Sequence, residues 1–197
     1  MAVSEVSICS NALRRLGDKA IASFTESDVR ASRCADLWPT VRDDILRAKL
    51  WNCAKKRVLL APLTEEPAFD WTYQFQKPSD WIRTVRVGYD GQDTLFRDEG
   101  GKYLADINPL PVTYIFRNTN CATYDSALVS VLELAMAAQL AYAVTQSQAV
   151  ADTCLAQLEK ALRRAGALSS NDDGPEDIGS FDLLASRFRS RSTDTIY

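Results

Sequence analysis

The sequence contains no histidine, so it lacks the most common general base and the most common zinc ligand in proteins. Glycine patterns of the P-loop or Rossmann type are also missing, as is the G-x-S-x-G pattern of serine hydrolases. Without a histidine to activate a serine or cysteine, neither a serine hydrolase nor a thiol protease of the usual kind is expected. The residue types present therefore argue against an enzyme, and no cofactor or metal site is predicted.

Cysteine is sparse and carries no motif. The chain has five cysteines, an odd number at wide spacings, and no C-x-x-C pair. Such cysteines are typical of reduced, mostly buried thiols in a protein made in a cytosol. They are Cys9, Cys34, Cys53, Cys121 and Cys154.

Targeting and membrane signals are also scarce. The first ten residues, MAVSEVSICS, include an acidic residue and no basic region, so no signal peptide is expected. The longest apolar run, about 129–144, contains Glu133 and Gln139 and is too short for a membrane span. We therefore expect no membrane-spanning segment.

Charge is nearly balanced, with Lys+Arg 23 against Asp+Glu 26. Nothing in that balance predicts a basic surface for nucleic acid. A length of 197 residues with 46% hydrophobic residues fits one domain, or one domain with an insertion.

Helical patterns occupy both ends of the folded part of the chain. Ser4 is a plausible N-cap and Gly17 a plausible C-terminal cap of the first helix. Pro39 predicts a kink or break in the second helix near 37–38, and Gly166 is expected to end the fourth. The expected helices are Ser4–Leu16, Ser27–Trp51, a third that starts near Tyr124–Ser126 and runs to about Gln146, and Gln148–Ala165.

The second of these helices carries apolar residues on two sides. Its main stripe is about 100° wide and would face the core; Leu46 and Leu50 fall on the opposite side. We interpret these two leucines as a candidate contact with another subunit. The stripe consists of Cys34, Leu37, Trp38, Val41, Ile45 and Ala48.

Strand patterns fill the middle of the chain. Residues 70–76 alternate, with Trp71, Tyr73 and Phe75 on one face, which indicates a half-buried strand rather than an aromatic ligand platform. Other strand signals are Arg57–Leu60, Trp81–Tyr89, Thr94–Phe96, Lys102–Leu104 and Val112–Arg117. The fold class predicted is α+β: an antiparallel bundle of about four helices (1–56 and 122–168) with one small inserted antiparallel sheet (57–121).

The last 29 residues, 169–197, differ in composition. The stretch SSNDDGPEDIGS is acidic and rich in helix breakers, which is typical of a linker. A short apolar and basic segment follows it and is too short to fold alone, so we interpret it as a docking arm. A tail packed on its own domain, or a disordered end, is the alternative. The candidate arm residues are Phe181, Leu184, Arg187, Phe188, Arg189 and Arg191.

Four short motifs occur in a definite order along the chain. The first is N-A-L-x-x-L-G at residues 11–17, and the second is R-D-x-x-L-R-x-x-x-W-N-x-A at 42–54. The third is P-x-D-W-I-R at 78–83, and the fourth is V-x-Y-I-x-R at 112–117, followed by an alanine-rich helix pair. Over residues 4–165 this order resembles the tail tubular protein A family, the head-to-tail adaptors of short-tailed (podovirus) phages. Cys53 departs from the larger residue, often Phe, expected after Trp51-Asn52.

The resemblance implies a structural virion protein without enzymatic activity. It implies a homo-oligomeric ring of about twelve copies that joins the portal protein to the tail nozzle protein. Contact with a tail fibre is a further expectation. DNA would pass through the bore during ejection without specific binding, the arm would reach the portal, and the protein would be made in the host bacterial cytoplasm.

Two other functions stay open on the residues alone. A carboxylate-based hydrolase of cell-wall glycan would need two carboxylates facing one cleft, drawn from Asp70, Asp80, Asp90, Asp93 or Glu99. A small interaction or chaperone-like protein would use residues 169–197 to bind its ligand. Adjacent Asp43 and Asp44 point about 100° apart on a helix and are expected only on a solvated face.

Overall fold

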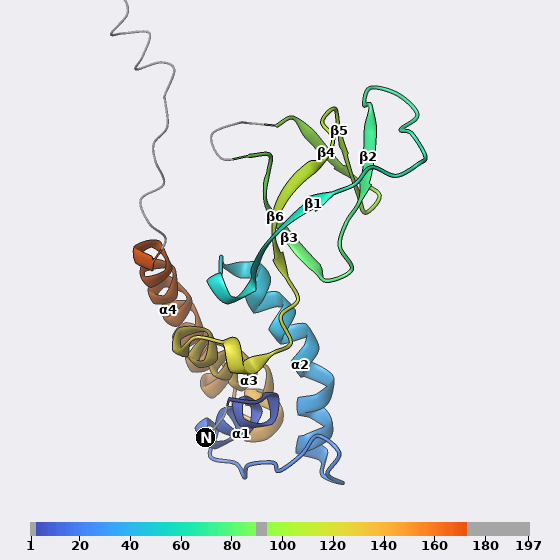
Figure 1. Cartoon of the computed structure of the whole chain (residues 1–197). Helices are drawn as coiled ribbons and strands as arrows, with labels where there is room; N and C mark the ends of the chain where they lie inside the picture. Colours follow the sequence, from blue (N-terminus) through green and yellow to red (C-terminus); the bar gives the residue numbers. More distant parts are fainter. Residues whose placement is uncertain (1–2, 90–93, 173–197) are drawn as a thin grey trace, which may run out of the picture.

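A computed structural model describes residues 3–89 and 94–172. Four helices form a body, and six strands lie between the second and third helices in sequence, as an insert at one end of that body (Figure 1). The predicted α+β class is confirmed. The helices are α1 Glu5–Arg15, α2 Val29–Ala48, α3 Ser126–Thr145 and α4 Gln148–Asp172.

Side-chain caps start the first two helices. Ser4 caps α1 as predicted, because its hydroxyl accepts from the Ser7 amide and Ser7 reciprocates. Gly17 has φ 79° just after α1, a left-handed conformation that glycine adopts without strain. The cap of α2 is Asp28 rather than the predicted Ser27, and its carboxylate accepts from the Arg30 amide.

Pro39 does not break α2, so of the kink or break predicted there, the break is wrong. The helix runs continuously from Val29 to Ala48 with Pro39 on its exposed side. Water can hydrate the carbonyl that loses its partner there, while buried Trp38 and Val41 hold both halves against the same core.

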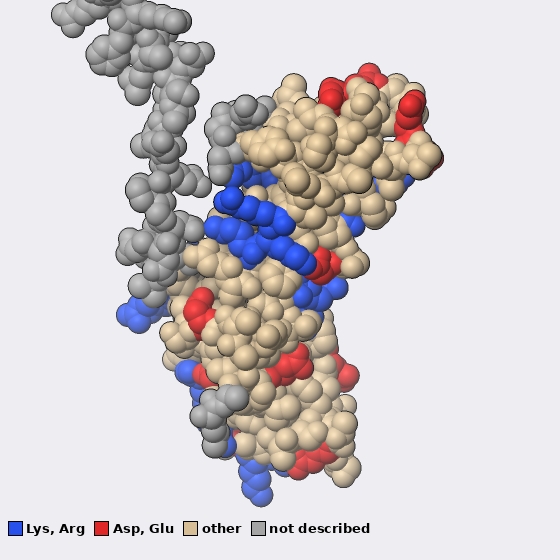
Figure 2. Space-filling model, viewed as in Figure 1, with Lys and Arg blue, Asp and Glu red and all other residues tan. Residues whose placement is uncertain are grey.

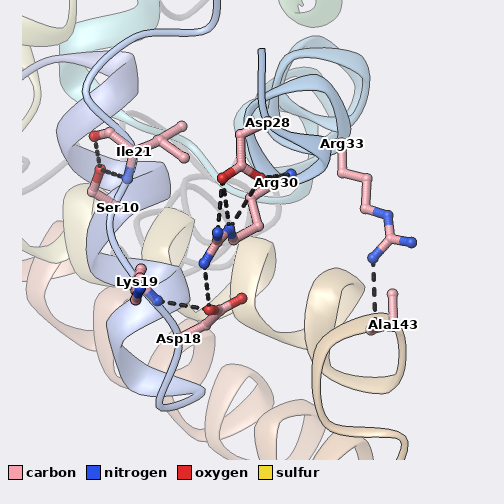
Figure 3. A network of polar contacts seen from close by, with 8 residues as sticks. All are labelled: Ser10, Asp18, Lys19, Ile21, Asp28, Arg30, Arg33 and Ala143. Atoms are coloured by element: carbon pink, nitrogen blue, oxygen red, sulfur yellow. Dashed lines mark hydrogen bonds and ion pairs between the residues drawn. The ribbon is translucent and has the colours of Figure 1, made fainter. Parts of the chain in front are cut away.

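The α1–α2 connection is held by a polar network (Figure 3). The Arg30 guanidinium binds Asp18 at 2.8 Å and Asp28 at 2.7 Å, and these hydrogen bonds lower the pKa of Asp28. The Ser10 hydroxyl donates to the Ile21 carbonyl and accepts from the Ile21 amide. These contacts fix α2 beside α1 although the connecting segment has no regular structure.

Helix α3 is the centre of the body and packs against α1, α2 and α4. By length and composition it could cross a membrane, but half of its most apolar stretch is buried inside this fold. Its Glu133 is only 8% exposed and binds Arg15 at 2.8 Å and Asn11 at 2.7 Å. A carboxylate paired in this way belongs to the protein core.

The strands form two sheets of three strands, whereas the sequence predicted one. Sheet A has the order β1-β6-β3 and sheet B the order β2-β5-β4, all antiparallel. A second apolar core, which includes Phe75, Tyr103, Val112 and Tyr114, is built from residues of both sheets. The strands are β1 Lys55–Leu60, β2 Tyr73–Gln76, β3 Trp81–Val87, β4 Phe96–Glu99, β5 Lys102–Ala105 and β6 Leu110–Phe116.

Helix α4 does not end at Gly166, contrary to the prediction. It continues to Asp172, so its last turn lies beyond the predicted body boundary at residue 168. A Cβ at position 166 would lie 2.7 Å from the Lys49 Nζ. Gly166 therefore permits a close approach between α4 and the end of α2 and does not mark a helix terminus.

Candidate assembly site

Residues of the second, third and fourth sequence motifs come together where the insert joins the body, whereas the first motif lies on α1, where Asn11 and Arg15 bind Glu133. Arg117 of β6 donates from Nε to Asp43 of α2 at 2.7 Å. Asp43 also accepts from the neighbouring Arg42, which is 7% exposed. Asp43 is therefore part of a structural ion-pair network, not the solvated position predicted for it; Asp44 is exposed as predicted.

Backbone carbonyls on both sides of the junction accept from the opposite element. Arg47 donates to the Ile82 carbonyl at 2.8 Å, and Arg83 donates to the Arg47 carbonyl at 2.9 Å. Fully buried Trp51 donates from Nε1 to the Ile45 carbonyl at 2.9 Å. The Trp51 and Arg83 bonds satisfy two of the free carbonyls at the end of α2, those of Ile45 and Arg47, and the two arginine bonds attach β3 to α2.

The Asp80 carboxylate links the third motif to the fourth through hydrogen bonds. It accepts from the Tyr114 hydroxyl at 2.9 Å and from the Lys56 ammonium at 3.0 Å. Partial burial opposes its ionisation, but these hydrogen bonds prevail and lower the pKa of Asp80. Burial and the bond to Asp80 in turn raise the pKa of Tyr114.

The predicted subunit-contact residues are not on the surface. Leu46 is 0% exposed and belongs to the helical core, so its assignment as a contact residue is wrong. Leu50 is half-buried against the same core. Leu46 lies inside, and Leu50 partly so, because the end of α2 packs against the helical core. The six candidate arm residues lie outside the described part of the chain.

Sheet A presents a basic face next to the junction. The cross-strand register places Lys55 and Arg57 of β1 in rows with Arg83 and Arg86 of β3, across Ile115 and Thr113 of β6. Figure 2 shows basic side chains gathered in a band between insert and body. The outer part of this face is a pocket of about 280 Å³, lined by Arg57, Val58, Leu59, Arg86, Gly88, Tyr89, Pro111, Val112 and Thr113. We call it the basic pocket.

An acidic loop projects from the opposite edge of the insert. Glu65, Glu66, Phe69 and Asp70 are exposed in the β1–β2 connection, with Phe69 76% exposed. Hydrogen bonds from the Leu63 amide to the Gln74 carbonyl and from Gln74 Nε2 to the Glu65 carbonyl hold the loop on β2. The loop is thus presented in a fixed conformation at the far end of the insert, where Figure 2 shows acidic side chains.

Two carboxylates of the hydrolase hypothesis line one pocket. Asp70 and Glu99 lie in a depression of about 550 Å³ together with Trp71, Arg97 and Lys102, and Asp70 has a positive φ of 68°. Asp80 is engaged by Lys56 and Tyr114, as described above. Asp90 and Asp93 lie outside the described residues.

No metal-binding cluster of three or more His, Cys, Asp or Glu residues occurs in residues 3–89 and 94–172. The five cysteines are free thiols; four are buried and Cys53 is half-buried. A hydrogen bond with Cys34 and burial raise the pKa of Cys9, so this thiol stays protonated. The prediction that the cysteines are unpaired and mostly buried is confirmed.

Sequence reasoning missed both the basic pocket and the acidic loop because it considered only the overall charge. Local counting would have found them: residues 45–64 contain five basic residues and no acidic one, and residues 81–89 contain two and none. Residues 64–70, TEEPAFD, contain three acidic residues and no basic one. The near-neutral total conceals two surfaces of opposite sign.

The second, third and fourth motifs thus converge on the junction, and the two charged surfaces lie on the insert beyond it. No protein-family model matches the chain, and no curated protein matches it significantly.

Proposed function

We propose that this chain is a structural virion protein, the head-to-tail adaptor of a short-tailed phage. In this proposal, copies form a ring that joins the portal to the tail nozzle and surrounds part of the DNA ejection channel. The chain carries no catalytic centre in this role and acts through its surfaces. Residues 173–197, which follow α4, are the proposed arm toward the portal.

One observation carries this proposal: three of the four motifs that resemble tail tubular protein A meet at one structural feature. Asp43 binds Arg117, and Asp80 binds Tyr114, so residues from the second, third and fourth motifs fasten the insert to the body. A rigid junction is what a connector needs, because force along the channel must pass between its two parts. The helical body with an inserted β region also matches the architecture that the resemblance implies.

Light scattering and electron micrographs of the purified chain, with and without the portal protein of its own phage, test this function. We expect closed rings of uniform size, either alone or on the portal. A chain that stays monomeric and ignores the portal would contradict the proposal. Removing residues 173–197 should weaken portal binding while leaving the helical body folded, because α4 is complete at Asp172.

The pocket beside the acidic loop supports a second candidate, a hydrolase of cell-wall glycan. Two carboxylates, Asp70 and Glu99, line it together with the aromatic Trp71, which are the residue types that glycan hydrolysis uses. Release of reducing sugars from purified peptidoglycan would support this activity, provided that Asp70→Asn and Glu99→Gln abolish it. No release by the unmodified chain would exclude it.

A further inference from the structure

We infer that the acidic loop of one copy docks into the basic pocket of a second copy, with the Phe69 side chain as its central apolar contact. This inference deepens the proposed ring function, because it names the two surfaces through which neighbouring subunits would meet. The charge of the two surfaces, the exposure of their side chains and their positions on the insert support it.

The two surfaces are complementary in charge. Arg57 and Arg86 line the pocket, and none of the described residues that line it carries a carboxylate. Arg57 is exposed and makes no hydrogen bond or ion pair with the residues that the structure describes. On the loop, Glu66 is exposed and likewise makes no such contact within the described ranges, whereas Glu65 lies 3.3 Å from Lys102. Opposite potentials of this kind steer association and fix its register.

Each of the two surfaces also exposes apolar side chains to water. Phe69 is 76% exposed on the loop, and Leu59 and Tyr89 are 60% and 54% exposed at the pocket. A buried aromatic side chain inside a rim of charges is the usual centre of a protein interface. A pocket of about 280 Å³ has room for one aromatic ring.

The surfaces lie on opposite sides of the insert. In the common view of Figures 1 and 2, the β1–β2 loop is at the right edge and the basic band is at the left. A copy that uses its loop on one neighbour therefore keeps its pocket for the next. Such a contact is heterologous, and its repetition closes into a ring or extends into a filament.

A polyanion such as nucleic acid is the other partner that a basic pocket could attract. We favour a second copy because the complementary acidic and apolar surface is present on this same chain. Binding of DNA to the pocket is the competing result that the experiment below can detect.

Charge reversal on either side tests the inference in the full-length chain. Arg57→Glu and Glu66→Arg should each prevent self-association at concentrations where the unmodified chain assembles, measured by sedimentation velocity at low salt. An equimolar mixture of the two variants should regain association, since one variant keeps the native loop, the other keeps the native pocket, and the two reversed charges are again opposite in sign. Phe69→Ser should weaken association without any change in charge.

Arg163→Glu and Glu159→Arg are the matched controls. Their side chains are 73% and 71% exposed on α4, outside the insert, and the two substitutions change the charge by the same amounts. Both should assemble like the unmodified chain. Recovery of association in the mixture also shows that neither insert variant failed merely because it unfolded.

Several results would overturn the inference. If the chain forms rings that Arg57→Glu and Glu66→Arg leave intact, the docking surfaces are wrong and the adaptor proposal survives. If the mixture of variants does not associate, or if Arg57→Glu abolishes binding of a fluorescent random-sequence DNA without changing self-association, the pocket has another partner. If the unmodified chain stays monomeric and also ignores the portal, the inference and the adaptor function both fail.

Discussion

Arg47 and Arg83 each donate a hydrogen bond to a backbone carbonyl on the opposite side of the junction between body and insert. Arg47 reaches from α2 to the Ile82 carbonyl beside Arg83, and Arg83 reaches from β3 to the carbonyl of Arg47 itself. The insert is therefore joined to the body by paired polar contacts in addition to its two chain connections.

Replacing Arg47 by Met should reduce the free energy of unfolding by about 1–2 kcal/mol, the usual cost of a hydrogen bond from a charged donor. Methionine keeps most of the apolar stem, so the loss reports the guanidinium contact. Urea denaturation followed by tryptophan fluorescence measures it, with Arg164→Met on exposed α4 as the control. Equal midpoints for the two variants would show that the contact contributes nothing.

Arg15→Met should destabilise the chain by about 2 kcal/mol, because Glu133 would lose its cationic partner while remaining buried. We expect a smaller loss of stability than for a fully buried ion pair, because the Arg15 side chain is 44% exposed. Arg14→Met, one residue away and exposed, is the matched control. A double variant Arg15→Met, Glu133→Leu should regain much of the loss; additive losses would argue against a coupled pair.

Asp80 should make stability depend on acid pH. Because hydrogen bonds from Lys56 and Tyr114 lower its folded-state pKa, its contribution is fully present above the unfolded value near 3.8 and is lost as pH falls through the lower folded value. Urea midpoints of the unmodified chain and of Asp80→Asn should therefore differ at neutral pH and converge below about pH 3.8. A difference that stays constant into that range would rule out this titration.

Native thiols should react slowly with Ellman's reagent at neutral pH. Four cysteines are buried, and burial raises the pKa of half-buried Cys53. We expect no more than one thiol to react promptly in buffer, and all five in concentrated denaturant. Cys53→Ser should remove the prompt reaction. Rapid labelling of several cysteines in the native chain would indicate that the helical core opens readily.

Periodicity and capping predicted the helices well because those signals are local. Ser4 and Gly17 act within a few residues of their own position, and the structure gives them the predicted roles. Gly166 and Pro39 carry equally strong local signals but lie where tertiary packing overrides them. Close contact with Lys49 explains the glycine, and the buried neighbours Trp38 and Val41 maintain the helix at the proline.

The surfaces were harder to predict because exposure depends on the whole fold. Leu46 lies opposite the main stripe of α2 on a helical wheel, yet other elements cover that side as well. The number of sheets depends on which strands pair, and pairing between β1 and β6 joins residues fifty or more positions apart. Charge clusters such as residues 64–70 are visible in the sequence, but their placement on opposite edges of the insert is not.

The polypeptide leaves the helical body and re-enters it at neighbouring points. Asn118, at the return, donates to the carbonyl of Cys53, at the exit, at 2.7 Å. A short bridge could span that gap, so the four helices have a topology that does not require the intervening strands. During evolution, the outer part of a segment inserted in this way can be exchanged or lengthened as long as residues such as Ile82 and Ile115 still complete the helical core, which lets the two parts of the molecule change at different rates.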